Sequence, residues 1–143
     1  MTGIDLAVDT SVAVALLIDS HDAHVPVLAA LGGKRLALPQ HALVETYSVL
    51  TRLPGDARIE LADAVRLIDE NFLAVLVPKP ETALRVHSLC AAQGVGGGAI
   101  YDAIVALAAR DHSVELVTRD KRAESTYKSL AVTYSIIAGA IAR

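Results

Sequence analysis

The chain has too few cysteines and too short apolar runs for several large classes of protein. Its single cysteine, Cys90, has no partner for an intramolecular disulfide, which fits a reducing cytoplasm. No apolar run approaches the roughly 18 residues that a membrane-spanning helix needs. Residues 1–5 lack the basic and then apolar order of a secretory signal. We therefore expect a cytoplasmic protein that does not enter a membrane.

Aromatic residues are also scarce: the chain has four tyrosines, one phenylalanine and no tryptophan. Alanine, valine, leucine and isoleucine must therefore fill its core. A hydrophobic content of 53% and a mean hydropathy of +0.45 argue against disorder. A length of 143 residues suits one continuous core, and neither a linker nor a repeat divides it. We expect a single domain over residues 1–143.

The chain lacks the excess of positive charge that proteins coating nucleic acid usually have. Its formal net charge is −3, whereas phosphate contacts dominate the affinity of such proteins. A nuclease avoids this requirement if cations bound to it face the phosphate, with help from local basic residues such as Arg119, Lys121 and Arg122. The net charge therefore does not decide between a nucleic-acid enzyme and other functions.

Short runs rich in β-formers alternate with helical stretches, which is the pattern of an α/β domain with a mostly parallel central sheet flanked by helices. Strands are predicted near residues 4–9, 35–38, 73–77, 114–118 and 132–136. Helices are predicted at 11–18, 23–31, 40–52, around 61–68, and at 80–93, 99–111 and 121–130. The helix over 99–111 is apolar almost all round, so we expect it in the middle of the domain.

Four acidic residues occupy comparable places in this pattern. Asp9 and Asp120 follow predicted strands, while Glu45 and Asp102 lie in the first turns of predicted helices. In a parallel sheet, strand ends and the starts of the following helices share one edge, where ligands bind. Carboxylates gathered there repel one another unless a cation joins them, and oxygen ligands suit Mg²⁺ or Mn²⁺. The pattern therefore predicts a metal-dependent enzyme.

Each of these acids also has a simpler explanation when taken alone. Asp9 and Asp120 could cap helices, and Asp102 suits a helix start because of the helix dipole. Glu45 could pair with His41 one turn earlier. Chance does not readily explain one acid at each of four separate elements, and this joint placement favours a shared site.

Two other kinds of site are weaker candidates. His21 with His24, and His87 with Cys90, have spacings that could bind zinc, but neither pair has a second half. The first strand also suggests a phosphatase with an aspartyl nucleophile. Such enzymes need a second acid two positions later, where this chain has Ser11.

The residues around the four acids are more specific than the acids themselves. Taken together, residues 8–12, 43–54, 100–108 and 116–122 resemble the PIN-domain family, and more narrowly the VapC-type toxin ribonucleases. The similarity covers nearly the whole chain in the family's order, with all four acids present. It implies a single PIN-like domain.

The resemblance also implies an activity. It implies hydrolysis of RNA phosphodiesters with bound Mg²⁺ or Mn²⁺, leaving 5′-phosphate and 3′-hydroxyl ends. Asp9, Glu45 and Asp102 would be the principal metal ligands, and Asp120 would complete the catalytic site. The residues expected to orient a carboxylate or a water are Thr10, Ser11 and Thr118, whose hydroxyls could equally be helix caps.

Partners follow from the same resemblance. It implies an RNA substrate, a VapB-like antitoxin that binds and silences the enzyme, and a homodimer. Apolar residues such as Val49, Leu53 and Ile59 could form a groove for a partner, or could belong to the core. The alternative is a PIN nuclease of RNA processing, or one that acts on DNA, outside a toxin–antitoxin pair.

Overall fold

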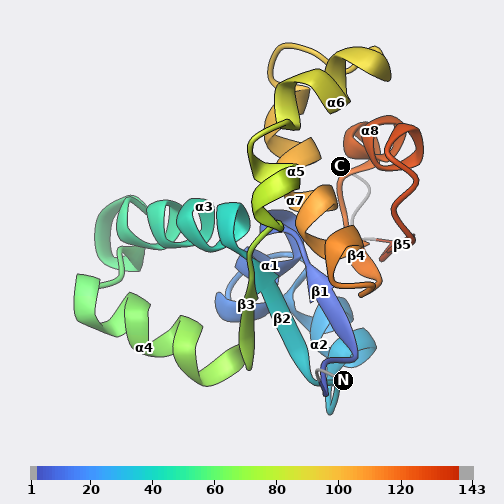
Figure 1. Ribbon diagram of the computed structural model, residues 1–143. Coiled ribbons are helices and arrows are strands. Elements are labelled where there is room, and N and C mark those ends of the chain that lie inside the picture. The colour runs from blue at the N-terminus through green and yellow to red at the C-terminus, as the bar shows by residue number, and fades with distance from the viewer. Residues whose placement is uncertain (1–2, 139–143) are drawn as a thin grey trace.

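The computed structural model describes residues 3–138, which form a five-stranded parallel sheet with helices on both faces (Figure 1). All five predicted strands are confirmed: β2 is shifted by one residue and the other four are slightly shorter than expected. In sequence order they are β1 (Leu6–Val8), β2 (Leu36–Pro39), β3 (Ala74–Leu76), β4 (Leu116–Thr118) and β5 (Tyr134–Ile136). The fold class is the α/β class that the sequence predicted.

The central strand of the sheet is β1, because the strand order is β3-β2-β1-β4-β5. The chain leaves β1 toward β2 and β3, and then crosses over to place β4 on the other side of β1. The register pairs Leu6 with Leu36 on one side of β1 and Val8 with Val117 on the other. The C-terminal ends of β1 and β4 therefore form the switch point at which open α/β sheets bind ligands.

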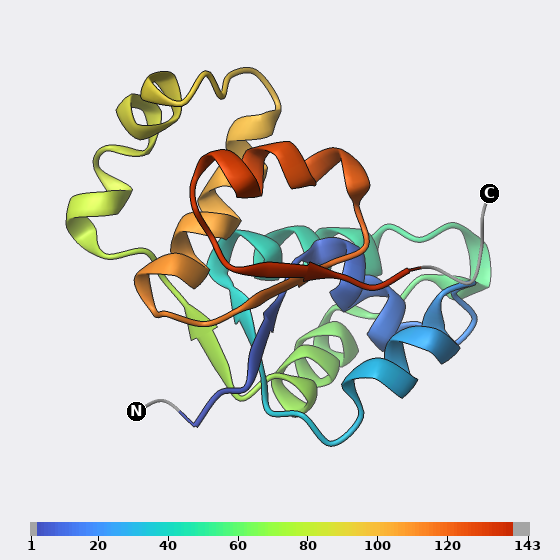
Figure 2. The ribbon, with the colours of Figure 1, turned by 90° about the vertical axis from the view of Figure 1, so that its right-hand side faces the viewer.

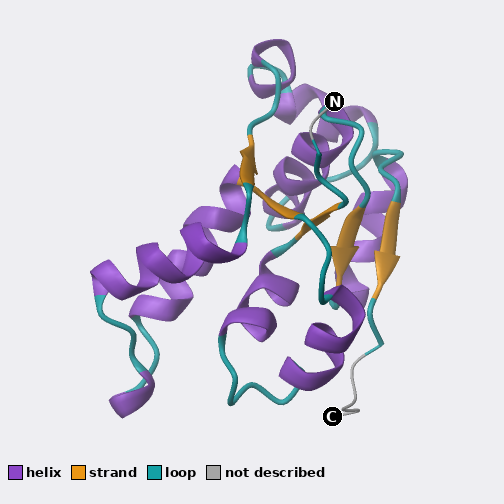
Figure 3. Ribbon diagram, turned by 90° about the horizontal axis from the view of Figure 1, so that it is seen from below, coloured by secondary structure: helices purple, strands orange, loops and turns teal. Residues whose placement is uncertain are grey.

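The helices form two groups, one on each face of the sheet. Helices α1 and α2 lie on one face and α7 and α8 on the other, while α3 and α4 extend outward as a pair (Figures 1 and 2). The view from below shows the same layers, with strands between helices (Figure 3). The helices, with the 3-10 turns η1 and η2, are α1 (Thr10–Leu17), α2 (His24–Leu31), α3 (Gln40–Thr51), η1 (Gly55–Ala57), α4 (Leu61–Asn71), α5 (Pro80–Ala83), α6 (Val86–Ala92), α7 (Ala99–Asp111), η2 (Lys121–Ala123) and α8 (Glu124–Ser129).

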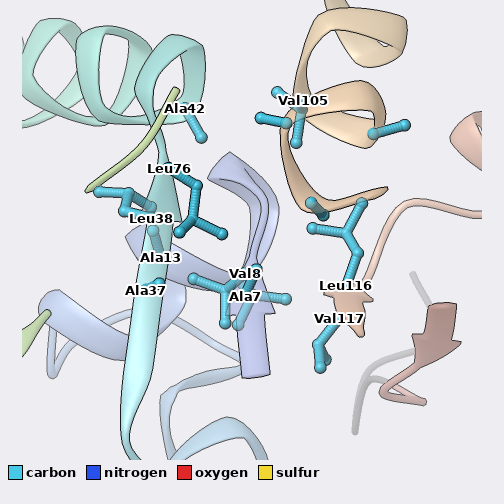
Figure 4. Packing of buried hydrophobic residues seen from close by; sticks show 14 of the residues in the cluster. Ala7, Val8, Ala13, Ala37, Leu38, Ala42, Leu76, Val105, Leu116 and Val117 are labelled. Atoms are coloured by element: carbon cyan, nitrogen blue, oxygen red, sulfur yellow. The ribbon is translucent and has the colours of Figure 1, made fainter. Parts of the chain in front are cut away.

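The core is built mainly from alanine, valine and leucine, as the shortage of aromatic residues required. Figure 4 shows small side chains of the sheet, such as Ala7 and Ala37, packed with Leu38 and Leu116. Small side chains let helices approach the sheet closely. Helix α7 buries six of its 13 residues, Ala103 and the continuous run 105–109, so its expected central position is confirmed.

The structure differs from the predicted helices in two places. The helix predicted over 80–93 is divided into α5 and α6, because the backbone tightens where the Arg85 N–H donates to the Thr82 carbonyl three residues earlier. Neither glycine nor proline marks this break. The helix predicted over 121–130 begins as the 3-10 turn η2 before α8 starts at Glu124. Both differences are local and leave the sheet unchanged.

The described helices are also too short or too polar for a bilayer. Within residues 3–138, none combines the length and the hydropathy of a membrane span.

Candidate active site

All four predicted acids line one pocket of about 180 Å³ beside the ends of β1 and β4. They come from four separate elements, which are the end of β1, α3, α7 and the end of β4. Of the three hydroxyl residues predicted to support them, two line the same pocket and Thr118 is buried next to it. The pocket-lining residues are Asp9, Thr10, Ser11, Glu45, Asp102, Val105 and Asp120.

Asp9 is the most buried of these acids, with only 6% of its surface exposed. Its Oδ1 accepts hydrogen bonds from the Ser11 hydroxyl at 2.6 Å and from the Val12 N–H at 3.3 Å. Its Oδ2 accepts from the Tyr127 hydroxyl at 2.9 Å. Burial raises the pKa of Asp9, while the hydrogen bonds from Ser11, Thr118, Tyr127 and Val12 oppose that rise. The carboxylate therefore caps α1 and also faces the pocket.

Glu45 reaches the pocket because α3 begins directly after β2, with no loop between them. The Thr10 hydroxyl donates to Glu45 Oε1 at 2.8 Å and fixes that carboxylate against α1. His41 lies one turn earlier, with its Nε2 3.6 Å from Glu45 Oε2. The pairing with His41 that the sequence suggested is present, and Glu45 still lines the pocket.

The Ser11 hydroxyl joins the end of β4 to the start of α1, and the Thr118 hydroxyl makes a local bond at the end of β4. Ser11 Oγ accepts from the Arg119 N–H at 3.0 Å while it donates to Asp9. The buried Thr118 Oγ1 accepts from the Asp120 N–H at 3.0 Å. These hydroxyls bond to acid-bearing segments, whereas the side chain that caps α1 is the carboxylate of Asp9.

Asp120 lines the pocket and also caps a helical turn. Its Oδ1 accepts from the Arg122 N–H at 2.9 Å at the start of η2. The Arg122 guanidinium Nε lies 3.6 Å from the same oxygen, but its side chain is 95% exposed. A contact this exposed is weak, so Arg122 does little to hold the Asp120 carboxylate away from the pocket.

Asp102 shows most directly that the carboxylates affect one another. Its pKa rises to about 6, first because burial disfavours its charged form and then because Asp120, Asp9 and Glu45 repel that charge. Arg122 opposes this rise. A bound cation would offset this repulsion between the carboxylates.

The four carboxylates surround the pocket without converging on a single point. Within residues 3–138, no group of three acidic, histidine or cysteine side chains is close enough to ligate one metal ion directly. A hydrated ion tolerates such a spread, because Mg²⁺ usually keeps several of its waters and takes only one or two carboxylates directly. The all-oxygen donor set and the size of the pocket therefore fit a hydrated Mg²⁺ or Mn²⁺.

Three contributors to the site could not be recognised in the sequence. Tyr127 is fully buried and donates to Asp9 from 118 positions away. Arg119 holds Ser11 through its backbone N–H and donates from Nη1 to the Ser11 carbonyl at 3.4 Å. Tyr101 stacks on the His41 ring beside the acids. None of these contacts has a local signal, since each joins segments far apart in the chain.

A larger apolar groove of about 330 Å³ lies between α3 and α4, and it contains none of the four acids. The residues suggested for a groove on these helices do not line it: Val49, Leu53 and Ile59 are half-buried, and Ile59 packs against the core. The groove is lined instead by Leu43, Val44, Tyr47, Val65, Ile68 and Asp69.

Comparison with known proteins identifies the class. The family model described as PIN domain matches residues 6–129, so the chain belongs to the PIN-domain family. More narrowly, it belongs to the VapC ribonucleases. Ribonuclease VapC27 of Mycobacterium tuberculosis is 50% identical over 127 residues, which are 89% of this chain and 93% of that protein. Ribonuclease VapC40 of the same organism is 40% identical over 139 residues, covering 92% of this chain and 98% of the relative.

Solved structures agree on the fold. DNA-bound VapBC from Salmonella typhimurium aligns with a TM-score of 0.67 at 14% identity, over 94% of this chain and 99% of that one. At this identity the match shows the fold alone, and the fold is that of a VapBC component.

Proposed function

We propose that this protein is the toxin of a toxin–antitoxin pair and that it cuts RNA at the acid pocket with Mg²⁺ or Mn²⁺. The observation that carries the proposal is the shared pocket of Asp9, Glu45, Asp102 and Asp120, in a chain 50% identical to a VapC ribonuclease. The net charge of −3 is no obstacle, because a cation held by these acids would offset their charge next to the phosphate.

Asp9, Glu45 and Asp102 are proposed to hold the hydrated cation, one or two of them directly and the rest through its waters, and Asp120 is proposed to complete the set. When bound, a divalent cation activates water and offsets the negative charge that develops on the phosphate. The chain's own contribution is to hold its carboxylates ionised and in place. Hydrogen bonds from Tyr127 and Ser11 favour the ionised form of Asp9. The Thr10 hydroxyl holds the Glu45 carboxylate in place.

The proposed reaction is hydrolysis. Water attacks the phosphorus in line with the bond to the 3′ oxygen, and that bond breaks as the new one forms. The leaving oxygen takes a proton and becomes a 3′-hydroxyl, and the phosphate stays on the 5′ end of the downstream fragment. The hydroxyls of Thr10 and Ser11 line the pocket and are proposed to orient the attacking water through hydrogen bonds.

The central experiment measures RNA cleavage by the purified protein with Mg²⁺ or Mn²⁺, and again with EDTA. Asp9→Asn and Glu45→Gln keep the shape of each side chain but remove the charge that holds a hard cation. We expect both variants to lose cleavage and to relieve the growth arrest that the wild type causes when it is expressed alone. Undiminished cleavage in EDTA, or full toxicity of Asp9→Asn, contradicts the metal site.

We also propose a VapB-like antitoxin as partner, a homodimeric assembly and a cytoplasmic location. The VapC relatives and the likeness to a VapBC complex support the antitoxin. Charge complementarity favours a basic antitoxin side chain among the pocket acids. If such a side chain inhibits the enzyme, replacing the arginines and lysines of the antitoxin's binding segment releases RNase activity. Inhibition that survives all these replacements means that the antitoxin does not inhibit through basic side chains.

Light scattering of the isolated toxin tests the proposed dimer.

A further inference from the structure

Tyr101 presents an aromatic ring to solvent beside the acid pocket. All five aromatic side chains lie within residues 3–138, and Tyr101 is the one classed as exposed, at 54%. Phe72 and Tyr127 are buried, and the remaining two are half-buried. A chain that otherwise covers its few aromatic rings leaves this one open.

The ring is held in a fixed orientation by a second ring. Tyr101 stacks on His41 with ring centroids 5.4 Å apart and an angle of 15° between the planes. The stack joins α3 to α7, and the His41 side chain is only 23% exposed. A large ring that is already ordered loses little conformational freedom when a planar ligand packs on it.

The stack is tied to the acids on both of its sides. Tyr101 immediately precedes Asp102 in α7, and His41 Nε2 lies 3.6 Å from Glu45 Oε2. When the acids engage a phosphodiester through a cation, the chemical group within reach of a neighbouring side chain is the base or the sugar of an adjoining nucleotide. Proteins bind unpaired bases by stacking them on aromatic rings, and every base has a face that can stack.

We propose that Tyr101, supported by His41, stacks on a nucleobase next to the scissile phosphodiester and so positions single-stranded RNA in the pocket. This inference rests on the ribonuclease function proposed above. It adds affinity to the cation-mediated phosphate contact in a chain whose net charge of −3 does not itself attract RNA. Stacking is also tolerant of sequence, so Tyr101 fixes where a base lies without fixing which base it is.

The first test is steady-state cleavage of a single-stranded RNA by three variants. Tyr101→Leu removes the ring, Tyr101→Phe keeps it, and Leu84→Ala is the control that shortens another exposed apolar side chain, 78% exposed and outside the pocket. Loss of one stacked base predicts a rise in KM of roughly 5- to 150-fold for Tyr101→Leu. The rise should be similar at low and high salt, while the Phe and control variants stay near the wild type. Thermal melts check that all three are folded.

The second test reads the contact itself and does not depend on activity. The chain has no tryptophan, so Tyr101→Trp carries a single fluorescent reporter at the proposed platform. The probe is the same RNA with an uncleavable methylphosphonate at the cut, in Mg²⁺. We expect this RNA to quench the tryptophan fluorescence. An abasic nucleotide at one position beside the cut should abolish the quenching.

The abasic RNAs also give a cleavage test that a purely structural role of Tyr101 does not satisfy. At the stacked position, the abasic change should raise KM for the wild type but not raise it further for Tyr101→Leu. Equal losses for both enzymes at every position, or a wild-type KM for Tyr101→Leu, overturn the stacking proposal. If the wild type itself cuts no RNA with metal, the proposed function fails first, so the two failures are distinguishable.

Discussion

Replacing Asp102 by asparagine separates a shared metal site from a favourable residue at a helix start. The substitution keeps the shape of the side chain and removes one of four neighbouring charges. Asp102 is half-buried in the first turn of α7, and its pKa rises from 3.8 to about 6 because of burial and the carboxylates of Asp120, Asp9 and Glu45. Its ionised form is therefore destabilising in the folded protein without metal.

The size of the effect follows from the pKa. A rise of about 2 in the pKa corresponds to about 3 kcal/mol when nothing screens the charge, and solvent around this half-exposed group reduces that to about 1 kcal/mol. Loss of the helix-dipole contact costs about 0.3–1 kcal/mol in the opposite direction. Without metal at pH 7, Asp102→Asn should therefore melt at or slightly above the wild type.

The raised pKa of Asp102 also predicts how the stability of the wild type changes with pH. A folded pKa above the unfolded one contributes stability that is fully present below about pH 4 and is lost as the pH rises through about 6. The metal-free wild type should therefore lose stability relative to the variant over this interval. Melting curves at pH 4, 5, 6 and 7 in EDTA measure the difference.

Bound metal should reverse the order of the two melting temperatures, so that the wild type melts above Asp102→Asn. A ligand at 100 times its dissociation constant stabilises the folded state by about 2.7 kcal/mol, which is a rise of roughly 8 °C in Tm for a domain of this size. The wild type should show that rise with Mn²⁺, and Asp102→Asn should show much less of it. The matched control is Asp63→Asn, which changes an aspartate in the first turn of α4 outside the pocket and should respond to metal like the wild type. An equal rise for Asp102→Asn and the wild type would refute the shared site.

Two hydroxyl contacts give the remaining predictions. Tyr127→Phe removes a donor to Asp9, so the pKa of Asp9 should rise further and the acid limb of the pH profile of cleavage should move to higher pH. The same change should cost about 1–3 kcal/mol in the free energy of unfolding. The control Tyr134→Phe removes a donor to Glu124 outside the pocket and should leave the pH profile in place, whereas an unchanged profile in Tyr127→Phe contradicts this role. Thr10→Val removes the hydroxyl that donates to Glu45 at 2.8 Å and should lower kcat, measured at saturating RNA, whereas Thr10→Ser keeps the hydroxyl and should keep kcat near the wild type. Equal rates for the Val and Ser variants would mean that this contact does not position Glu45.

Much of the architecture was determined by the sequence alone. The alternation of short apolar runs with helical periods predicts five strands, and each is present within one residue of the predicted range. The places of Asp9, Glu45, Asp102 and Asp120 at strand ends and helix starts predict one common edge, and all four line one pocket there. Such predictions succeed because period, strand ends and helix starts are local properties of the chain, and parallel topology then brings like ends together.

The tertiary structure decided the contacts that set the properties of those acids. Whether Asp9 is a cap or a pocket residue could not be decided locally, and the fold makes it both. The Tyr127 donor to Asp9 and the ring of His41 under Tyr101 join segments 118 and 60 positions apart. The break between α5 and α6 carries no glycine or proline signal either. Burial and long-range hydrogen bonds arise only when the elements pack, so the raised pKa values of Asp9 and Asp102 are set by the folded molecule and not by their sequence neighbours.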